Sequence, residues 1–409
     1  MEYLNFEQKR QFNEILQFLG ESLDITQTQF DAAVRSYNVV GEWLSSPESQ
    51  LYRYRPEILP QGSFMLGTMI RPINEDDDLD IDLVCRLEGK QSSWTQADVK
   101  AIVGNRLADH GTLKKLLELP DGRRCWTLQY YDSANFHMDV LPSVTSTGYR
   151  ILMERTLTEA EASAESLAIR ITDKYEDNYK TDSIPKNWPK SNPFGYGIWF
   201  ESRARISGRE IKLMTEAVQP VPKYQKNKLP LQRVVQILKR HRDIMFNGDE
   251  DKPISIIITT LTARAYQQET DIYEALQNAL NRIPAFIEER WSEKHQRNIK
   301  WIPNPVNPEE NFADKWPEKP KKEENFYKWL FQVKNDISEA IGQSSMTSIM
   351  ESLKQPFGEN LLNEALGGYG KSLLHQRESG AMKMAASTGI VGEVGRTTVT
   401  QHNPYGKSK

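Results

Sequence analysis

The stretch EDDDLDIDLVCRL, residues 75–87, decides how the rest of the sequence is interpreted. From residue 79 onward apolar and polar side chains alternate, a pattern typical of a β-strand with one buried face. Side chains alternate between the two faces of a strand. The apolar face of this predicted strand therefore holds Leu79, Ile81, Leu83 and Cys85, and the opposite face holds Asp78, Asp80 and Asp82.

This row of aspartates has two interpretations. Carboxylates at this spacing repel one another, so the arrangement is costly unless a cation lies between them. A solvated acidic edge is the alternative, and we expect it for the loop residues Glu75, Asp76 and Asp77. The apolar face fixes the register of the strand, which keeps its carboxylates on one side. From this strand alone, a metal site and a solvated edge are equally good interpretations.

A second predicted strand, FHMDVLPS at residues 136–143, shows the same alternation and puts His137 and Asp139 on its polar face. If the two strands are neighbours, Asp139 adds a third carboxylate. Oxygen ligands of this kind suit Mg²⁺, which takes few protein carboxylates together with substrate phosphates. Three such carboxylates match a two-metal site for phosphoryl transfer. We expect His137 to be a structural hydrogen-bonding residue rather than a ligand.

Gln61, Gly62 and Ser63 lie about 17 residues before the Asp-x-Asp strand. A glycine lets backbone N–H groups approach a phosphate, and a serine adds a hydroxyl donor. The pair alone is weak evidence, but together with Asp80, Asp82 and Asp139 it frames one pocket. This combination resembles the polymerase-β-type nucleotidyltransferases.

The remaining patterns predict an α+β nucleus followed by helices. Two helices are expected within residues 7–45, one within residues 99–118, and a β-hairpin from residues 124–130 and 135–141, so that the sheet is largely antiparallel. Beyond a turn-rich stretch at residues 174–200, helices are expected at residues 197–205, 231–246, 255–268, 271–283 and 323–353, with a Pro-rich connector at residues 301–322. The domain boundaries that we expect are N-terminal helices at 1–55, a nucleotidyltransferase core at 56–205, a helical domain at 206–377 and a mobile tail at 378–409.

Composition narrows the class of protein. The chain has 409 residues, with 52 basic and 56 acidic side chains and a formal net charge of −4, which argues against a basic nucleic-acid coat. Two cysteines are too few for a disulfide scaffold or a four-cysteine zinc site. The longest apolar stretch, near residues 254–261, is too short for a membrane helix, and the N-terminus lacks a signal-peptide pattern. We therefore expect a cytoplasmic protein that does not associate with membranes.

The amino-acid sequences of several motifs resemble those of a narrower family, the CD-NTases, which are the bacterial relatives of cyclic GMP–AMP synthase. The six motifs are GSFMLGTMIRP (62–72) with DLDIDLVCRL (78–87), FHMDVLPS (136–143), SNPFGYGIWF (191–200), LQRVVQILKRHRDIMF (231–246), PISIIITTLTA (253–263) and NPEENFADKW (307–316). Their order and spacing cover residues from about 60 to 330. The family pattern places its paired carboxylates just before a Leu-Val, which selects Asp80 and Asp82 and leaves Asp78 as the alternative two positions away.

The resemblance implies a bilobed polymerase-β-like core and a specific activity. CD-NTases join nucleoside triphosphates into cyclic di- or trinucleotides and release pyrophosphate, in bacterial anti-phage signalling (CBASS) whose product switches on an effector. Asp80, Asp82 and Asp139 would then be catalytic and hold two Mg²⁺ ions, with Mn²⁺ as a substitute. Gln61, Gly62 and Ser63 would bind the donor nucleotide, ATP or GTP being the expected types.

The family pattern also gives roles to Lys239 and Ser255, which resemble residues that grip the β- and γ-phosphates. A lysine is a compact charge suited to phosphate, and a serine at a helix N-terminus adds a donor where the dipole favours anions. A solvated helix face is the alternative for the basic cluster at residues 239–242, and the spacing to Ser255 favours phosphate contact for Lys239. Arg240 and Arg242 stay undecided.

Several aromatic residues have two interpretations as well. Tyr196, Trp199, Phe200 and Trp316 are of the type that stacks on nucleobases. Aromatics four residues apart more often make core contacts, so we favour the core for each. Asn192 is a candidate for a hydrogen bond to a base edge.

Two other functions compete with cyclic-nucleotide synthesis. A template-independent RNA nucleotidyltransferase would need a basic track for its acceptor strand, and the negative balance argues against strong nucleic-acid binding. A non-catalytic nucleotide- or RNA-sensing module would have less reason to keep all three carboxylates. The last residues, TTVTQHNPYGKSK (397–409), resemble a tail that a ubiquitin-like conjugation system attaches to other molecules in relatives; a disordered end is the alternative.

Overall fold

A mixed β-sheet forms the centre of one lobe of the computed structural model, which describes residues 6–74, 78–131, 135–146, 167–205, 223–224, 226–343, 346–381, 383–384, 391–392 and 397–399. The sheet runs in the order β1-β2-β4-β5-β6, and β3 pairs with β4. Only the β2–β4 pair is parallel among the described strands of this sheet. Its strands are β1 (Glu57–Gln61), β2 (Leu79–Glu88), β3 (Trp126–Tyr130), β4 (Phe136–Thr145), β5 (Ile169–Ile171) and β6 (Lys190–Ser191).

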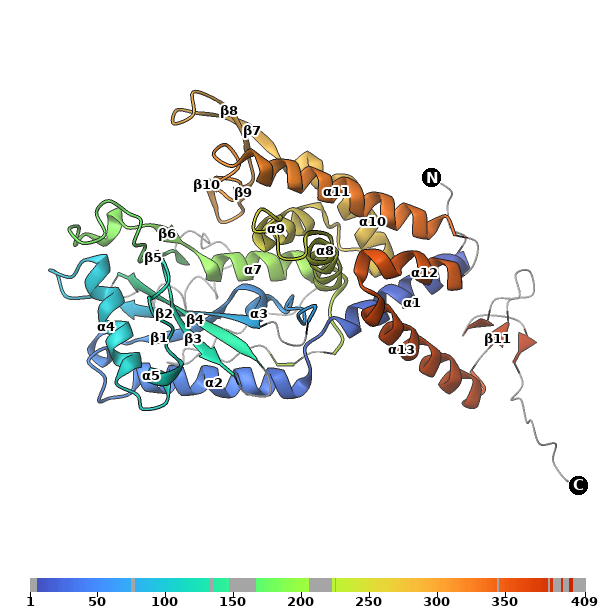
Figure 1. Cartoon of the computed structure of the whole chain (residues 1–409), viewed down its shortest axis with the longest axis horizontal. Helices are drawn as coiled ribbons and strands as arrows, with labels where there is room; N and C mark the ends of the chain where they lie inside the picture. Colours follow the sequence, from blue (N-terminus) through green and yellow to red (C-terminus); the bar gives the residue numbers. More distant parts are fainter. Residues whose placement is uncertain are drawn as a thin grey trace, which may run out of the picture.

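Helices cover both faces of this sheet (Figure 1). On one face lie α2 (Gln27–Ser45), α4 (Gln96–Ala108) and α5 (Leu113–Leu116), which bury the predicted apolar row of β2. On the other face a smaller cluster, which includes Val84 and Leu141, packs against Phe194 of α7 (Pro193–Ala204). The short helix α3 (Gly62–Leu66) follows β1 directly. The predicted burial of Leu79, Ile81, Leu83 and Cys85 is confirmed.

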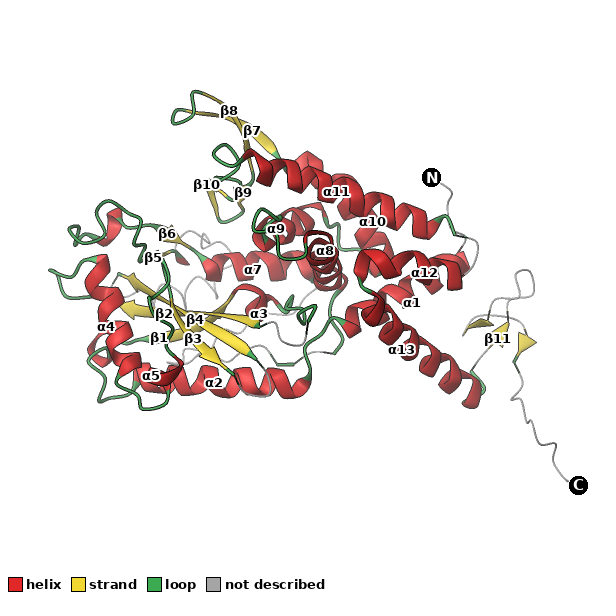
Figure 2. Ribbon diagram, in the orientation of Figure 1, coloured by secondary structure: helices red, strands yellow, loops and turns green. Residues whose placement is uncertain are grey.

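The second lobe is helical and shares one large core (Figure 2). Its helices are α8 (Pro230–Phe246), α9 (Ser255–Ala265), α10 (Ile272–Arg282), α11 (Pro320–Ile341), α12 (Met346–Phe357) and α13 (Glu359–Glu378), joined by the N-terminal helix α1 (Phe6–Ser22). Pro230 occupies the first turn of α8, where a missing backbone N–H costs nothing. Among the described residues, no helix has the length and apolar character needed to cross a membrane.

Two β-hairpins interrupt the helical lobe between α10 and α11. One consists of β7 (Glu288–Ser292) and β8 (Arg297–Trp301), and the other of β9 (Pro303–Asn304) and β10 (Asn307–Asn311). Both lie at the top of the view in Figure 1. The Pro-rich connector expected at residues 301–322 therefore contains β9, β10 and the last residue of β8.

Other boundaries also differ from the expected ones. The single helix expected at residues 323–353 is two helices, α11 and α12, which are separated near Gly342. The helix expected from residue 197 begins at Pro193, because Asn192 caps its N-terminus by accepting a hydrogen bond from the Gly195 N–H (2.8 Å). The acidic loop at residues 75–77 and most of the tail beyond residue 381 lie outside the described residues. The four domain boundaries stay predictions.

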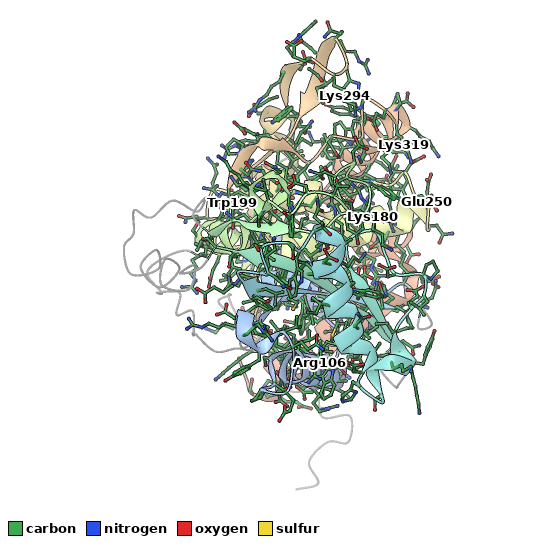
Figure 3. All side chains as sticks on the ribbon, turned by 90° about the vertical axis from the view of Figure 1, so that its left-hand side faces the viewer. Arg106, Lys180, Trp199, Glu250, Lys294 and Lys319 are labelled. Atoms are coloured by element: carbon green, nitrogen blue, oxygen red, sulfur yellow. The ribbon has the colours of Figure 1, made fainter. Side chains whose placement is uncertain are left out.

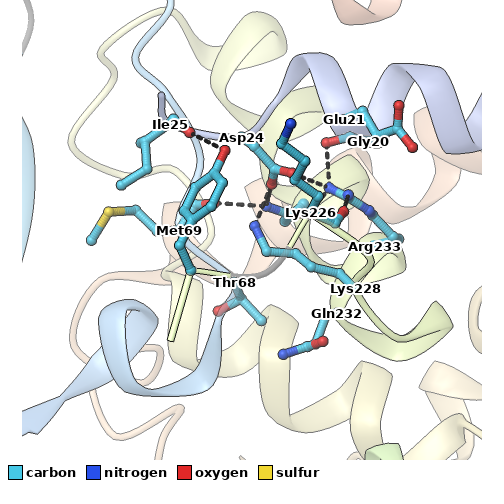
Figure 4. A network of polar contacts seen from close by, with 12 residues as sticks. Gly20, Glu21, Asp24, Ile25, Thr68, Met69, Lys226, Lys228, Gln232 and Arg233 are labelled. Atoms are coloured by element: carbon cyan, nitrogen blue, oxygen red, sulfur yellow. Dashed lines mark hydrogen bonds and ion pairs between the residues drawn. The ribbon is translucent and has the colours of Figure 1, made fainter. Parts of the chain in front are cut away.

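The bend between α1 and α2 passes from the helical lobe to the sheet lobe. Thr26 caps α2 through a reciprocal pair of hydrogen bonds with Gln29. Next to this bend, Arg233 of α8 donates hydrogen bonds to the carboxylate of Asp24 (2.9 Å) and to the carbonyl of Gly20 (2.6 Å). Lys228 forms an ion pair with the same carboxylate. Figure 4 shows these side chains converging on the bend, which fixes how the two lobes meet.

Candidate functional site

The three predicted carboxylates lie on two adjacent parallel strands. Asp82 of β2 is directly opposite Asp139 of β4, and Asp80 is opposite His137. All four side chains line one cavity of about 180 Å³. Because the other faces of β2 and β4 are buried, this register is strongly fixed, and it brings the polar residues together as the alternation predicts.

Charges within this group perturb one another. Burial, then the charges of Asp139 and Asp80, raise the pKa of Asp82 to about 6. A hydrogen bond from His137 lowers the pKa of Asp80, and the same bond raises the pKa of His137 to about 8. The two side chains form an ion pair with Nε2 and Oδ1 2.5 Å apart. His137 is thus a hydrogen-bonding partner of the carboxylate cluster, which agrees with the expected structural role.

Each remaining carboxylate has its own partner. Asp139 accepts a hydrogen bond from the Thr127 hydroxyl (2.6 Å) of β3. Asp78 accepts one from the Gln129 amide (2.6 Å) and lies outside the cavity that Asp80, Asp82 and Asp139 share. With these pairings, no three His, Cys, Asp or Glu side chains within the described part of the chain converge closely enough to hold one ion.

A glycine at the start of α3 allows the turn after β1 to approach the carboxylates. Gln61, the last residue of β1, lies opposite Asp82 in the antiparallel register. Gly62 follows with φ of +59°, a backbone conformation that disfavours residues with a Cβ. A Cβ at this position would collide with the carboxylate of Asp82. Among the two cavities described here, neither is lined by Gln61 or Gly62.

A larger cavity of about 420 Å³ lies between the two lobes and is lined by Ser63, Asp80, Lys239 and Ser255 among others. Asp80 lines both cavities, so the carboxylate cluster lies beside this space. Ser63 comes from α3, Lys239 from α8 and Ser255 from the first turn of α9. Ser63 and Ser255 therefore line the same cavity, although they are 192 positions apart in the sequence.

The basic side chains of this cavity are held by the structure around them. Lys239 is buried and donates a hydrogen bond to the Thr68 carbonyl (3.1 Å). Burial, then the nearby charge of Arg242, lower the pKa of Lys239 to about 8. Arg242 donates to the Ser255 hydroxyl (3.1 Å) and so orients it at the N-terminus of α9. Such an N-terminus favours an anion, since its backbone N–H groups carry partial positive charge.

The aromatic candidates lie elsewhere. Tyr196, Phe200 and Trp316 are buried in the core of the helical lobe, and the Tyr196 hydroxyl is hydrogen-bonded to Thr260 (2.8 Å). Trp199 is half-buried and packs against the same core. In Figure 3 it lies on the side of the molecule opposite Glu250, which follows the cavity-lining loop at residues 247–248. The core interpretation fits all four residues.

The remaining candidate Asn192, the undecided Arg242 and two missed residues complete this description. Asn192 is buried and its side-chain oxygen caps α7, so that oxygen is engaged within the protein. Arg242 and Lys252 line the large cavity with Lys239, as does Arg71 from the segment after α3. The spacing of residues 239 and 242 on one helix face offers a signal for Arg242. Arg71 lies in the motif GSFMLGTMIRP (62–72), but no local pattern assigns it a role.

The comparisons with known proteins agree with this geometry. Residues 56–142 match the family model described as cyclic GMP–AMP synthase DncV-like, nucleotidyltransferase domain. This segment contains Ser63, Asp80, Asp82 and Asp139.

Curated relatives extend the similarity to nearly the whole chain. A c-di-GMP synthase of Roseivirga ehrenbergii is 27% identical over 94% of this chain and 93% of its own length. The cyclic dinucleotide synthase CdnG of Bradyrhizobium diazoefficiens is 22% identical over 88% of this chain and 85% of its own length. The structure of that CD-NTase in complex with GTP superimposes with a TM-score of 0.62, covering 88% of this chain and 99% of that one. Residues 56–142 are therefore a DncV-like nucleotidyltransferase domain, in a chain that is similar to cyclic dinucleotide synthases over nearly its whole length and shares the fold of a CD-NTase.

Proposed function

We propose that this chain joins nucleoside triphosphates into a cyclic di- or trinucleotide and releases pyrophosphate. The observation that carries the proposal is that Asp80 lines both cavities, so that the carboxylate cluster and the cationic cavity adjoin each other. A donor triphosphate in the large cavity would have its reacting phosphate beside the carboxylates. The two curated relatives are a c-di-GMP synthase and a cyclic dinucleotide synthase, which supports the same chemistry.

The carboxylate cluster suits divalent cations, Mg²⁺ first and Mn²⁺ as a substitute. Its donors are all carboxylate oxygens, and the pKa of Asp82 is raised first by burial and then by the charges of Asp139 and Asp80, a repulsion that a bound cation would relieve. Asp80, Asp82 and Asp139 would hold two ions, with Asp80 exchanging its bond to His137 for a metal bond. When bound, such ions activate an attacking hydroxyl and neutralise the charge that develops on the leaving pyrophosphate.

The protein's own groups orient the donor nucleotide. Ser63 offers a hydroxyl close to the carboxylates, and Ser255, held by Arg242, offers another at the N-terminus of α9. Lys239 places a charge at the wall of the large cavity, and a bound anion would favour the protonated form of its amine. These groups position the phosphates and compensate charge, which supplies most of the catalysis in phosphoryl transfer.

For a cyclic dinucleotide the proposed reaction has two rounds, and a cyclic trinucleotide would need one further attack that releases a third pyrophosphate. A 3′- or 2′-hydroxyl of one nucleotide attacks the α-phosphate of another in line, which forms a phosphodiester bond and releases pyrophosphate. The linear intermediate then turns over in the site, so that its remaining hydroxyl faces the triphosphate that it still carries. A second attack closes the ring and releases the second pyrophosphate.

Product analysis tests this proposal directly. Purified protein is incubated with Mg²⁺ or Mn²⁺ and the four labelled triphosphates, and phosphatase-resistant products are identified by mass spectrometry. D80N and D82N should each abolish synthesis, whereas D78N should retain more of it, because Asp78 lines only the larger cavity and its carboxylate is hydrogen-bonded to Gln129. Synthesis that persists in D80N and D82N but is lost in D78N would move the site by two residues.

The same assay separates the competing functions. A template-independent RNA nucleotidyltransferase would extend an added RNA and give long products instead of small phosphatase-resistant ones. A nucleotide-sensing module would bind triphosphates without releasing pyrophosphate. Either result would refute cyclic-nucleotide synthesis as the activity of this chain.

The proposal extends to the cell, where the resemblance to CD-NTases implies anti-phage signalling through a product-activated effector. Bacteria carrying the wild-type gene with its neighbouring genes should plate phage less efficiently than bacteria carrying the D82N variant. Equal plating in both strains would reject this cellular role and leave the chemistry intact.

A further inference from the structure

The segment between α3 and β2 forms part of the wall of the large cavity, and other elements fix its backbone. The Arg71 N–H donates to the Leu23 carbonyl (2.9 Å), and Arg240 of α8 donates to the Arg71 carbonyl (2.5 Å). Gln236 of α8 donates to the Met69 carbonyl (2.7 Å). Figure 4 shows Met69 beside the bend where Asp24 lies. The backbone of Arg71 is therefore held on both sides while its side chain extends from it.

The side chain of Arg71 joins this cavity to the C-terminal helix. Arg71 lines the cavity, and its Nη2 lies 2.5 Å from Oε2 of Glu364 on α13. The two side chains are 33% and 53% exposed. An ion pair that is open to water is weak, because solvent and salt screen it and two long side chains must be ordered. Glu364 thus holds the guanidinium loosely.

The other cations of the cavity have different partners. Arg242 and Lys252 lie beside Asp243, which is itself part of the cavity wall, with N–O distances of 2.7 and 3.5 Å. Lys239 donates to a backbone carbonyl. Among the cavity-lining cations that the structure describes, Arg71 is the one whose ion-pair partner comes from α13.

We propose that Arg71 binds the triphosphate of the donor nucleotide and that Glu364 holds its guanidinium at the rim of the cavity until the nucleotide enters. The inference rests on the proposed function, since it assumes that this cavity takes a nucleoside triphosphate. A guanidinium presents two parallel N–H groups that match two phosphate oxygens, and a triphosphate carries more charge than one carboxylate. The exchange of partners therefore favours the nucleotide.

This exchange couples α13 to the occupancy of the site. Nucleotide binding releases Glu364, and by reciprocity any change that moves Glu364 away from Arg71 tightens nucleotide binding. The helix α13 packs along α1 and precedes the C-terminal residues of the chain. A partner or modification that displaces this helix would therefore raise the affinity for nucleotide.

Calorimetric titration with ATP and GTP analogues that carry a methylene group between the α- and β-phosphates tests the inference without turnover. In the presence of Mg²⁺, R71A should bind about tenfold more weakly than the wild type, with R71K between the two. E364Q should bind about threefold more tightly. E351Q is the matched control, because it removes a carboxylate from an exposed ion pair with Lys354 on the neighbouring helix α12, away from the cavity.

A double variant distinguishes a contact through Arg71 from a general effect of charge. If Glu364 acts by holding Arg71, R71A/E364Q should bind as weakly as R71A alone. A gain from E364Q that persists in the R71A background, or R71A binding that equals that of the wild type, would overturn the inference. If thermal unfolding shows that R71A does not fold, the affinities of R71K and E364Q are compared with that of the wild type instead. Wild-type affinity in both variants would then overturn the inference.

The outcome also separates this inference from the proposed function. A chain that binds the analogues through Arg71 but forms no cyclic product would refute the proposed function alone. A chain that forms the product while R71A keeps full affinity would refute the role of Arg71 alone.

Discussion

Adding a single methyl group at Gly62 should lower the rate of catalysis far more than it lowers the stability of the fold. The φ of +59° at Gly62 and the closeness of the Asp82 carboxylate leave no room for a Cβ. In G62A the backbone strain should cost about 1–2 kcal/mol of unfolding free energy. The carboxylate can turn away, since it is the end of a flexible side chain, so the collision itself should add little to that cost.

The effect on synthesis should be much larger. A turned Asp82 no longer faces Asp139 and Asp80 across the small cavity. Because a displacement of about 1 Å in a catalytic group costs about 100-fold in rate, we expect G62A to lose at least about 100-fold in the rate of product formation. Pyrophosphate release under saturating triphosphate measures this rate, and thermal unfolding measures the stability.

Gly380, at the end of α13, provides the matched control. It also has a positive φ, +73°, but a Cβ there would meet nothing within 4 Å. G380A should therefore carry backbone strain of the same kind and keep the wild-type rate. The reasoning fails if G62A keeps the wild-type rate, or if G380A loses as much activity as G62A.

Three further substitutions test other parts of the structure. The pKa of Lys239 is lowered to about 8, so its charge is lost as the pH rises through that value. The affinity for the nucleotide analogues should therefore fall about tenfold between pH 7 and pH 9. K239M should bind weakly with no such pH dependence, and titration calorimetry at each pH measures both effects. Asp173 is buried, and burial alone would raise the pKa of its carboxyl group. Hydrogen bonds from Arg123, the Tyr175 backbone and Arg124 outweigh burial and lower that pKa. The carboxylate therefore stabilises the fold above its ordinary pKa of 3.8, and this stabilisation is lost as the pH falls through the lower pKa of the folded state. D173N should cost about 2 kcal/mol at pH 7 and less at pH 3 in denaturant unfolding, and an equal cost at both pH values would contradict this reasoning. D24N should cost about 3–5 kcal/mol, because it leaves the buried Arg233 without its carboxylate; a loss below about 1 kcal/mol in the same unfolding experiment would show that the bend tolerates the unpaired cation.

The carboxylate site was predictable because its signal is local. The alternation along β2 and β4 assigns Asp80, Asp82 and Asp139 to one side of the sheet, and parallel pairing then places them together. The alternation alone could not establish that β2 and β4 are neighbouring strands. Lys239 and Ser255 were reached only through the family resemblance, since a basic helix face has no pattern of its own that points to a phosphate.

Some other features lacked a local signal. The hairpin of β7 and β8 was missed because its sequences, EERWS and RNIKW, have no apolar alternation, and neither strand contains a buried residue. The break between α11 and α12 did have a local signal, Gly342 followed by polar residues, which the expectation of one helical stretch passed over. Arg71 was missed because its partner, Glu364, is 293 residues away in the sequence. Such a contact depends on how the two lobes are packed.

The path of the N-terminal helices has a consequence for how the chain can be made and divided. Leu16 and Leu19 of α1 complete the core of the helical lobe, while Tyr37 and Leu44 of α2 complete the core under the sheet. During synthesis α1 leaves the ribosome first, yet most of the surface that it buries is made last. Neither lobe should therefore fold as a separate fragment, and a fragment limited to residues 56–142 should expose apolar surface and aggregate.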